Sequence, residues 1–116
     1  MDINSIKQNL RNFADERDWD QFHTPKNLSM ALVKEASELM ELFQWLTPDE
    51  SQVKNLSADT VTLAEQELAD VLIFTIRLSD KLEIDLDTAV AAKMQLNRDK
   101  YPVNLAKSNA TKYSRR

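Results

Sequence analysis

The sequence predicts an all-α fold, and three features of its composition support this prediction. Its 116 residues include no glycine and only three prolines, which argues against β-hairpins and glycine-rich phosphate loops. Long stretches without helix breakers are filled by Ala, Leu, Glu, Lys, Gln and Asp. Apolar residues make up 42% of the chain, enough for the core of one domain. We therefore expect a four-helix bundle-like domain at residues 1–106, followed by a basic, flexible tail at 107–116.

The composition also excludes several classes of function. Without cysteine the chain has neither disulfides nor thiolate metal ligands, and a single histidine excludes a multi-histidine site within one chain. A net charge of −4 does not support nucleic-acid binding, which needs a basic surface. The N-terminus lacks a signal-peptide pattern and no apolar run is long enough to span a membrane. We expect a cytoplasmic protein that contacts neither membranes nor nucleic acids.

The first helix is expected to run from a cap at Asp2 or Asn4 to about Arg17. Its apolar residues follow helical spacing at Ile3, Ile6, Leu10 and Phe13. The connector that follows contains Trp19 and the only histidine, His23. It is either a packed connector or one wall of a ligand pocket, because Trp19 offers a flat face for stacking.

The second helix is predicted to begin at Pro25, with Thr24 as its N-cap. It extends to Trp45 or Leu46, where Thr47-Pro48-Asp49 stops it.

The remaining elements follow from polar stretches and capping residues. Residues 47–57 are polar and are typical of a surface loop. The third helix is expected from a cap at Ser57 to about Leu82. A fourth helix covers roughly residues 86–101, with Asp85 or Asp87 as its cap, and ends before the next proline.

Two acidic pairs occupy positions that helical spacing assigns to the core. Glu35 and Glu38 lie on the apolar stripe of the second helix, and Glu67 and Asp70 interrupt the apolar run of the third. Carboxylates three residues apart stand side by side, and buried carboxylates are costly unless they are paired or bind metal. The pattern predicts a site for a hard divalent cation such as Mg²⁺. Salt-bridged or partly exposed carboxylates are the alternative, whereas a di-iron site would need two Glu-x-x-His motifs that are absent.

The fourth helix places two polar residues on an apolar stripe. Lys93 and Asn97 continue the line of Leu86, Val90 and Tyr101. They could contact an anionic ligand, or Lys93 could extend its amine to water past an apolar stem.

The chain resembles the MazG-type all-α nucleoside triphosphate pyrophosphohydrolases, in particular the dCTP pyrophosphatase branch. The resemblance begins with Glu35-x-x-Glu38 followed by Glu67-x-x-Asp70 and covers nearly the whole chain. Further matching stretches are Glu16-Arg17-Asp18-Trp19-x-Gln21-Phe22-His23-x-Pro25-x-Asn27-Leu28, Glu41-Leu42-Phe43-Gln44-Trp45, Val90-x-x-Lys93-Met94-x-x-Asn97-Arg98-x-x-Tyr101-Pro102, and the basic tail with Lys112-Tyr113.

This resemblance implies hydrolysis between the α and β phosphates of a (deoxy)nucleoside triphosphate, to the monophosphate and pyrophosphate. It implies that Mg²⁺, or Mn²⁺ in its place, is held by Glu35, Glu38, Glu67 and Asp70, with Glu38 orienting or deprotonating the attacking water. It further implies that the substrate is bound by Trp19, His23, Trp45, Phe74, Lys93, Asn97 and Arg98. The family also implies a homo-oligomer, usually a tetramer built as a dimer of dimers, with sites at subunit interfaces.

Two departures from the family pattern concern the base. Phe74 stands where dCTP-preferring relatives have a tyrosine, and Leu10 where a close relative has a histidine. Both put a strict preference for dCTP in doubt. One alternative is a related pyrophosphohydrolase acting on dUTP or a phosphoribosyl nucleotide, and another is a non-enzymatic helical interaction module with structural carboxylates.

Overall fold

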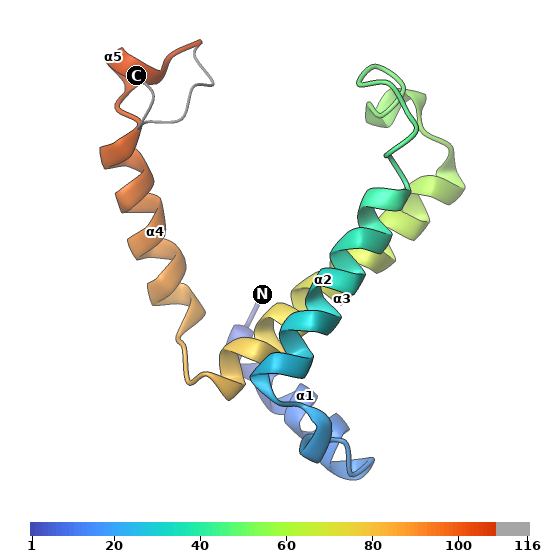
Figure 1. The fold of residues 1–116 in the computed structure, drawn as a ribbon, viewed down its shortest axis with the longest axis vertical. Helices are drawn as coiled ribbons and strands as arrows, with labels where there is room; N and C mark the ends of the chain where they lie inside the picture. The colour runs from blue at the N-terminus through green and yellow to red at the C-terminus, as the bar shows by residue number, and fades with distance from the viewer. Residues whose placement is uncertain (109–116) are drawn as a thin grey trace. The chain divides into compact units, whose positions relative to one another are not determined.

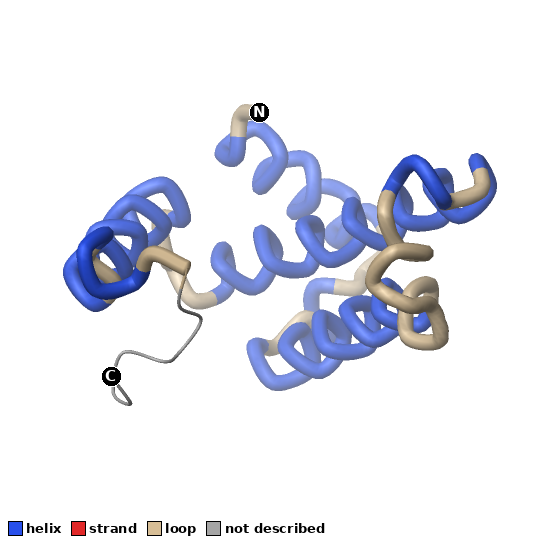
Figure 2. Tube along the Cα trace, turned by 90° about the horizontal axis from the view of Figure 1, so that it is seen from above, coloured by secondary structure: helices blue, strands red, loops and turns tan. Residues whose placement is uncertain are grey.

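The computed structural model describes residues 1–108, and these residues form helices joined by turns and loops without any strand (Figures 1 and 2). The predicted all-α class is confirmed. The chain divides into two compact units, Met1–Glu83 and a second that begins at Ile84. The domain boundary at residue 106 stays a prediction, and most of the predicted tail, with Lys112 and Tyr113, lies outside the described residues.

The first unit contains three long helices, α1 (Ile3–Glu16), α2 (Pro25–Glu41) and α3 (Ala58–Lys81). In this unit α2 and α3 lie side by side and run in opposite directions, and α1 packs against α3 (Figure 1). Each helix contributes one fully buried apolar residue, namely Ala14, Leu28 and Ile76. The small core lies where the three helices meet, toward the C-terminal end of α3.

The starts of these helices follow the predicted capping residues. The side chain of Asp2 accepts a hydrogen bond from the backbone N–H of Ser5, so Asp2 caps α1. Thr24 caps α2 in the same way, and Ser57 caps α3. Each cap satisfies one backbone N–H that has no partner inside the helix, which is why the sequence locates these helix starts well.

The end of α2 differs from the prediction. It ends at Glu41, whereas the sequence indicated Trp45 or Leu46. Beyond Glu41 the backbone N–H groups of Leu42, Phe43 and Leu46 donate to carbonyls three residues back, as in a 3₁₀ turn. Thr47 and Glu50 then form a reciprocal cap, because the N–H of Thr47 donates to Oε1 of Glu50 at 2.8 Å and the N–H of Glu50 donates to Oγ1 of Thr47 at 3.1 Å.

Short 3₁₀ helices occupy both connectors of the first unit. The loop between α2 and α3 contains η2 (Val53–Asn55), and the connector between α1 and α2 contains η1 (Asp20–Phe22). The chain turns into η1 through Asp18, whose φ of 56° is left-handed, a conformation that aspartate adopts more readily than most residues. Trp19 and His23 flank η1 on its two sides.

The second unit contains α4 (Leu86–Lys100) and a short helix that the sequence did not predict, α5 (Val103–Ala106). Asp85 is the N-cap of α4, since its side chain accepts from the N–H of Asp87. The predicted fourth helix at 86–101 is therefore confirmed to within one residue. None of the helices in residues 1–108 is both long and apolar enough to cross a membrane.

Candidate functional site

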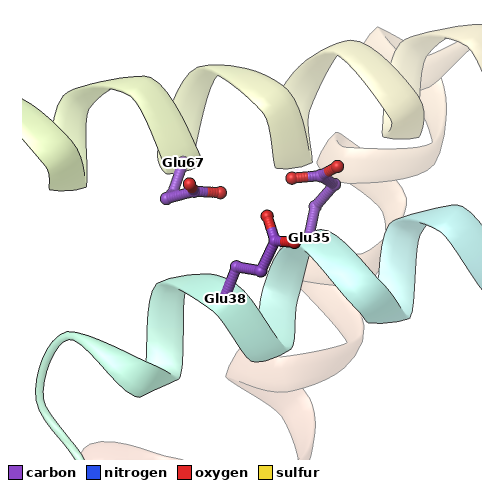
Figure 3. A group of neighbouring side chains, drawn as sticks. All are labelled: Glu35, Glu38 and Glu67. Atoms are coloured by element: carbon purple, nitrogen blue, oxygen red, sulfur yellow. The ribbon is translucent and has the colours of Figure 1, made fainter.

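Three glutamates face one another across the antiparallel pair α2 and α3. Glu35 and Glu38 extend from α2 toward Glu67 on α3 (Figure 3). One carboxylate oxygen from each residue lies within 4.8 Å of the other two. The i,i+3 spacing on α2 places both of its glutamates on the side that meets α3. The structure thus brings together residues from both predicted acidic pairs.

The three carboxylates repel one another in a partly buried site. Burial, followed by the neighbouring Glu38, raises the pKa of Glu35 to about 7. Burial also raises the pKa of Glu67, with the charge of Glu38 as the next cause. The Oε2 atoms of Glu35 and Glu67 are buried without a hydrogen-bond partner, and the cluster's one ion pair within residues 1–108 joins Glu38 to Lys34 at 3.9 Å. Protons or a cation must compensate this charge, and carboxylate oxygens suit a hard divalent cation.

Asp70 lies close to this cluster but outside its 4.8 Å limit. It follows Glu67 by three residues on α3, and its charge is a further cause, after burial and Glu38, of the raised pKa values of Glu35 and Glu67. Asp70 therefore adds to the negative field of the site. Its role as a fourth metal ligand stays a prediction.

A cavity of about 310 Å³ lies in the first unit, between α1, the η1 connector and α3. This volume is at the lower end of the range of small-molecule sites. Of the predicted substrate residues, Trp19, His23 and Phe74 come together in its wall. The full lining is Leu10, Phe13, Trp19, His23, Ile73, Phe74 and Arg77.

The cavity wall is mainly hydrocarbon and aromatic. The rings of Phe13 and Trp19 pack edge to face, with centroids 5.8 Å apart and an interplanar angle of 69°. The guanidinium of Arg17 lies 3.7 Å from the centroid of the Phe13 ring. Trp19 is 46% exposed, which leaves part of its surface available to a ligand. An apolar cavity with an accessible indole suits a flat aromatic ligand such as a nucleobase.

Arg77 is a cavity residue that the sequence prediction missed. Its side chain is only 5% exposed, and it is held by two carboxylates and the histidine. The Nη2 atom donates to Asp20 at 2.6 Å, Nη1 lies 3.5 Å from Asp80, and Nε donates to Nδ1 of His23 at 3.2 Å. The sequence does show an arginine inside the apolar run of the third helix, which could have marked this residue. Its partners are distant in sequence, so its role could not be predicted from that position alone.

The other predicted substrate residues are not part of the cavity wall. Trp45 lies beyond the end of α2 and is 87% exposed. Lys93, Asn97 and Arg98 lie on α4 in the second unit, where all three are exposed and Arg98 donates to the side chain of Gln95 at 2.8 Å. Their contact with a substrate stays a prediction.

Comparisons with known proteins agree with one another. The model of the MazG-like family matches residues 31–115. dCTP pyrophosphatase 1 of Homo sapiens is 44% identical over 112 residues, and the same protein of Bos taurus is 42% identical, in both cases over 97% of this chain. The chain spans 66% of the length of each of these relatives. A crystal structure of a pyrophosphatase from Archaeoglobus fulgidus superposes with a TM-score of 0.78 and 39% identity, over 85% of this chain and 91% of that one.

Proposed function

Because the chain belongs to the MazG-like family, we propose that it is a nucleoside triphosphate pyrophosphohydrolase. It cleaves a dNTP between the α and β phosphates, giving the dNMP and pyrophosphate, and so removes unwanted nucleotides from the pool. The names of the curated relatives favour dCTP or a similar nucleotide as substrate. The observation on which the proposal depends is the Glu35, Glu38 and Glu67 cluster, in which a cation can compensate the two buried oxygens of Glu35 and Glu67 that lack a hydrogen-bond donor.

We assign Mg²⁺ to this cluster, with Mn²⁺ as a substitute and Asp70 as the fourth ligand. One carboxylate oxygen of Glu35 and one of Glu67 are buried without a hydrogen-bond partner, and such oxygens are suitable ligands for a hard divalent cation. When bound, the cation polarises the phosphates and lowers the pKa of the attacking water. Glu38 is the most suitable residue to orient that water or accept its proton. Neither of its oxygens is buried without a hydrogen-bond partner, and its side chain is 36% exposed.

The base is assigned to the cavity in the first unit. Trp19 supplies a stacking surface, Phe74 an apolar wall and His23 a polar group at the base edge. Leu10 and Phe74 offer no hydrogen bond to a base, so we expect dUTP to be accepted beside dCTP.

The remaining predicted substrate residues are assigned to the phosphates and to the site of a neighbouring copy. We assign phosphate contacts to Lys93, Asn97 and Arg98, whose donors can neutralise charge that develops during cleavage. The exposed Trp45 is assigned to the site of a neighbouring copy in a homotetramer. A cytoplasmic location is part of the same proposal.

A pyrophosphate-release assay over dCTP, dUTP, dTTP, dATP and dGTP tests the proposal. We expect equal amounts of monophosphate and pyrophosphate from at least one pyrimidine substrate with Mg²⁺, and no product with EDTA. Release of inorganic phosphate from the γ position would contradict the assigned bond. Complete inactivity together with no Mg²⁺ binding by titration calorimetry would favour a helical interaction module with structural carboxylates.

A further inference from the structure

Arg77 is fixed between the cavity and a charged surface on its other side. It lines the cavity three residues after Phe74, and it also borders the polar depression that contains Asp20 and Asp80. All three of its guanidinium nitrogens meet an acceptor within 3.5 Å. A buried cation is costly unless it is compensated, and the two aspartates supply that compensation. The Arg77 side chain therefore has one well-defined position.

That position determines the protonation of His23. The Nε–H of an arginine is always present, so Nδ1 of His23 must accept it with a lone pair. The ring is then neutral and its proton is on Nε2. Burial lowers the pKa of His23, as do the charges of Arg77 and Lys81, while Asp20 opposes them. No other hydrogen bond to this ring occurs in residues 1–108, so Nε2–H remains available to a ligand.

Arg77 also anchors the backbone that presents the cavity residues. Asp20, the first residue of η1, accepts hydrogen bonds from Arg77 and from Nζ of Lys81, both at 2.6 Å. His23, the residue after η1, accepts from the same arginine. Trp19 immediately precedes η1. One side chain of α3 therefore holds both ends of the short turn on which Trp19 and His23 depend.

We propose that Arg77 is a positioning residue of the base site. It holds His23 as a hydrogen-bond donor through Nε2–H, and it holds Trp19 at the cavity wall. The ligand is then an aromatic ring with a carbonyl oxygen or an unprotonated ring nitrogen on its edge. This ligand assignment rests on the proposed nucleotide hydrolysis, whereas the state of His23 can be measured without substrate.

The tautomer is accessible by NMR because the chain contains a single histidine. In uniformly ¹⁵N-labelled full-length protein we expect a pyridine-like Nδ1 and a pyrrole-like Nε2, maintained from pH 8 to below the ordinary histidine pKa. Arg77→Lys keeps the charge but loses the planar Nε–H, so tautomer exchange and protonation at higher pH are expected. Arg11→Met is the matched control, since Arg11 bonds Asp80 in the same network without touching His23. A wild-type ring protonated on Nδ1, or identical His23 spectra in wild type and Arg77→Lys, would overturn the positioning role.

Kinetics test the consequence for the ligand. We expect Arg77→Lys to raise KM for the best nucleotide roughly three- to tenfold with kcat nearly unchanged, as for the loss of one hydrogen bond. The increase should be smaller at pH 6 than at pH 8, because a doubly protonated His23 donates through Nε2–H whichever tautomer the neutral ring prefers. Adding His23→Gln should restore KM in part, since a glutamine amide donates without needing a fixed tautomer.

A loss of kcat alone, or a change in KM that is the same at both pH values and is not restored by His23→Gln, would reduce Arg77 to a structural role. Inactivity of the wild type on every nucleotide would count against the proposed function. The NMR result would in that case decide the positioning role by itself.

Discussion

Glu35 links the fold of the first unit to proton and metal binding. Its pKa is raised from the ordinary 4.5 to about 7, first by burial and then by Glu38. Between these values the metal-free folded protein keeps a proton that the unfolded chain has released. The raised pKa therefore gives stability that is fully present at low pH and is lost as the pH rises through about 7. A bound cation reverses this preference, since it requires the deprotonated carboxylate.

We predict that Mg²⁺ binds about tenfold more weakly at pH 6 than at pH 8, because it must displace one proton held with a pKa of about 7. Titration calorimetry in buffers of different ionisation enthalpy would measure both the affinity and the protons released. In parallel, the Tm of the metal-free protein should fall between pH 6 and pH 8. Equal affinities at the two pH values, with no proton release, would show that Glu35 does not ligate the cation.

Glu38→Gln and Asp70→Asn are predicted to lower kcat at least about 100-fold, because each removes a carboxylate assigned to the metal or the water. Both residues are only partly buried, so the helical circular dichroism should remain nearly unchanged. Glu41→Gln is the matched control, since Glu41 is exposed at the end of the same helix. Normal turnover by either variant would remove that residue from the proposed site.

Residue spacing on a helix identified the acidic cluster but not the cavity residue Arg77. Glu35 and Glu67 could be found because each interrupts an apolar stripe that can be followed within one helix. Arg77 interrupts a stripe too, yet its meaning depends on Asp20 and His23, which are 57 and 54 residues away. Such pairings require the packing of α1 and η1 on α3, which no local pattern contains.

At the scale of elements, the starts of α2 and α3 were predicted correctly, whereas the end of α2 was not. A start is marked by one side chain that accepts a nearby backbone N–H, as Thr24 and Ser57 do. After Glu41 the helical hydrogen bonds shift toward carbonyls three residues back, and this ends α2. The amino-acid composition changes little at this point, so composition does not mark the end. Its signal was the Thr47-x-x-Glu50 pattern, a capping box that begins a new turn and so separates Trp45 from the helix.

The cap of α3 gives a stability prediction. Ser57→Ala removes the acceptor for the N–H of Thr60, which lies 3.1 Å from Oγ, and should lower the free energy of unfolding by about 1 kcal/mol. Thr62→Ala, in the first turns of the same helix, is the control. Its hydroxyl donates to the carbonyl of Ala58, which already belongs to the helix, and alanine favours the helix, so we expect no loss. Denaturant unfolding of both variants measures the difference, and equal stabilities would mean that this cap contributes little.

At the scale of the whole molecule, one chain leaves apolar helix surface uncovered. Met30, Val33 and Met40 on α2 are 62%, 68% and 57% exposed, and their spacing places them on one face. Leu68 and Leu72, one turn apart on α3, are also exposed. The sequence suggested that the apolar third helix needs more cover than one chain provides. It could not indicate which face stays open, because that depends on where α1 and α2 pack.

We predict that Val33→Glu weakens self-association and lowers activity together. Sedimentation velocity of the wild type should give a mass of several times 13.4 kDa, in line with the proposed tetramer. A charge at position 33 would be buried against a partner and left unpaired, so the variant should shift toward the monomer mass. Its kcat/KM should fall at the same protein concentrations, since the exposed Trp45 is assigned to a neighbouring copy. Gln52→Glu, an exposed loop change of the same sign, should alter neither property. A wild type that is fully active at the monomer mass would show that one chain forms the complete site, and Trp45 would then have no role in binding the base.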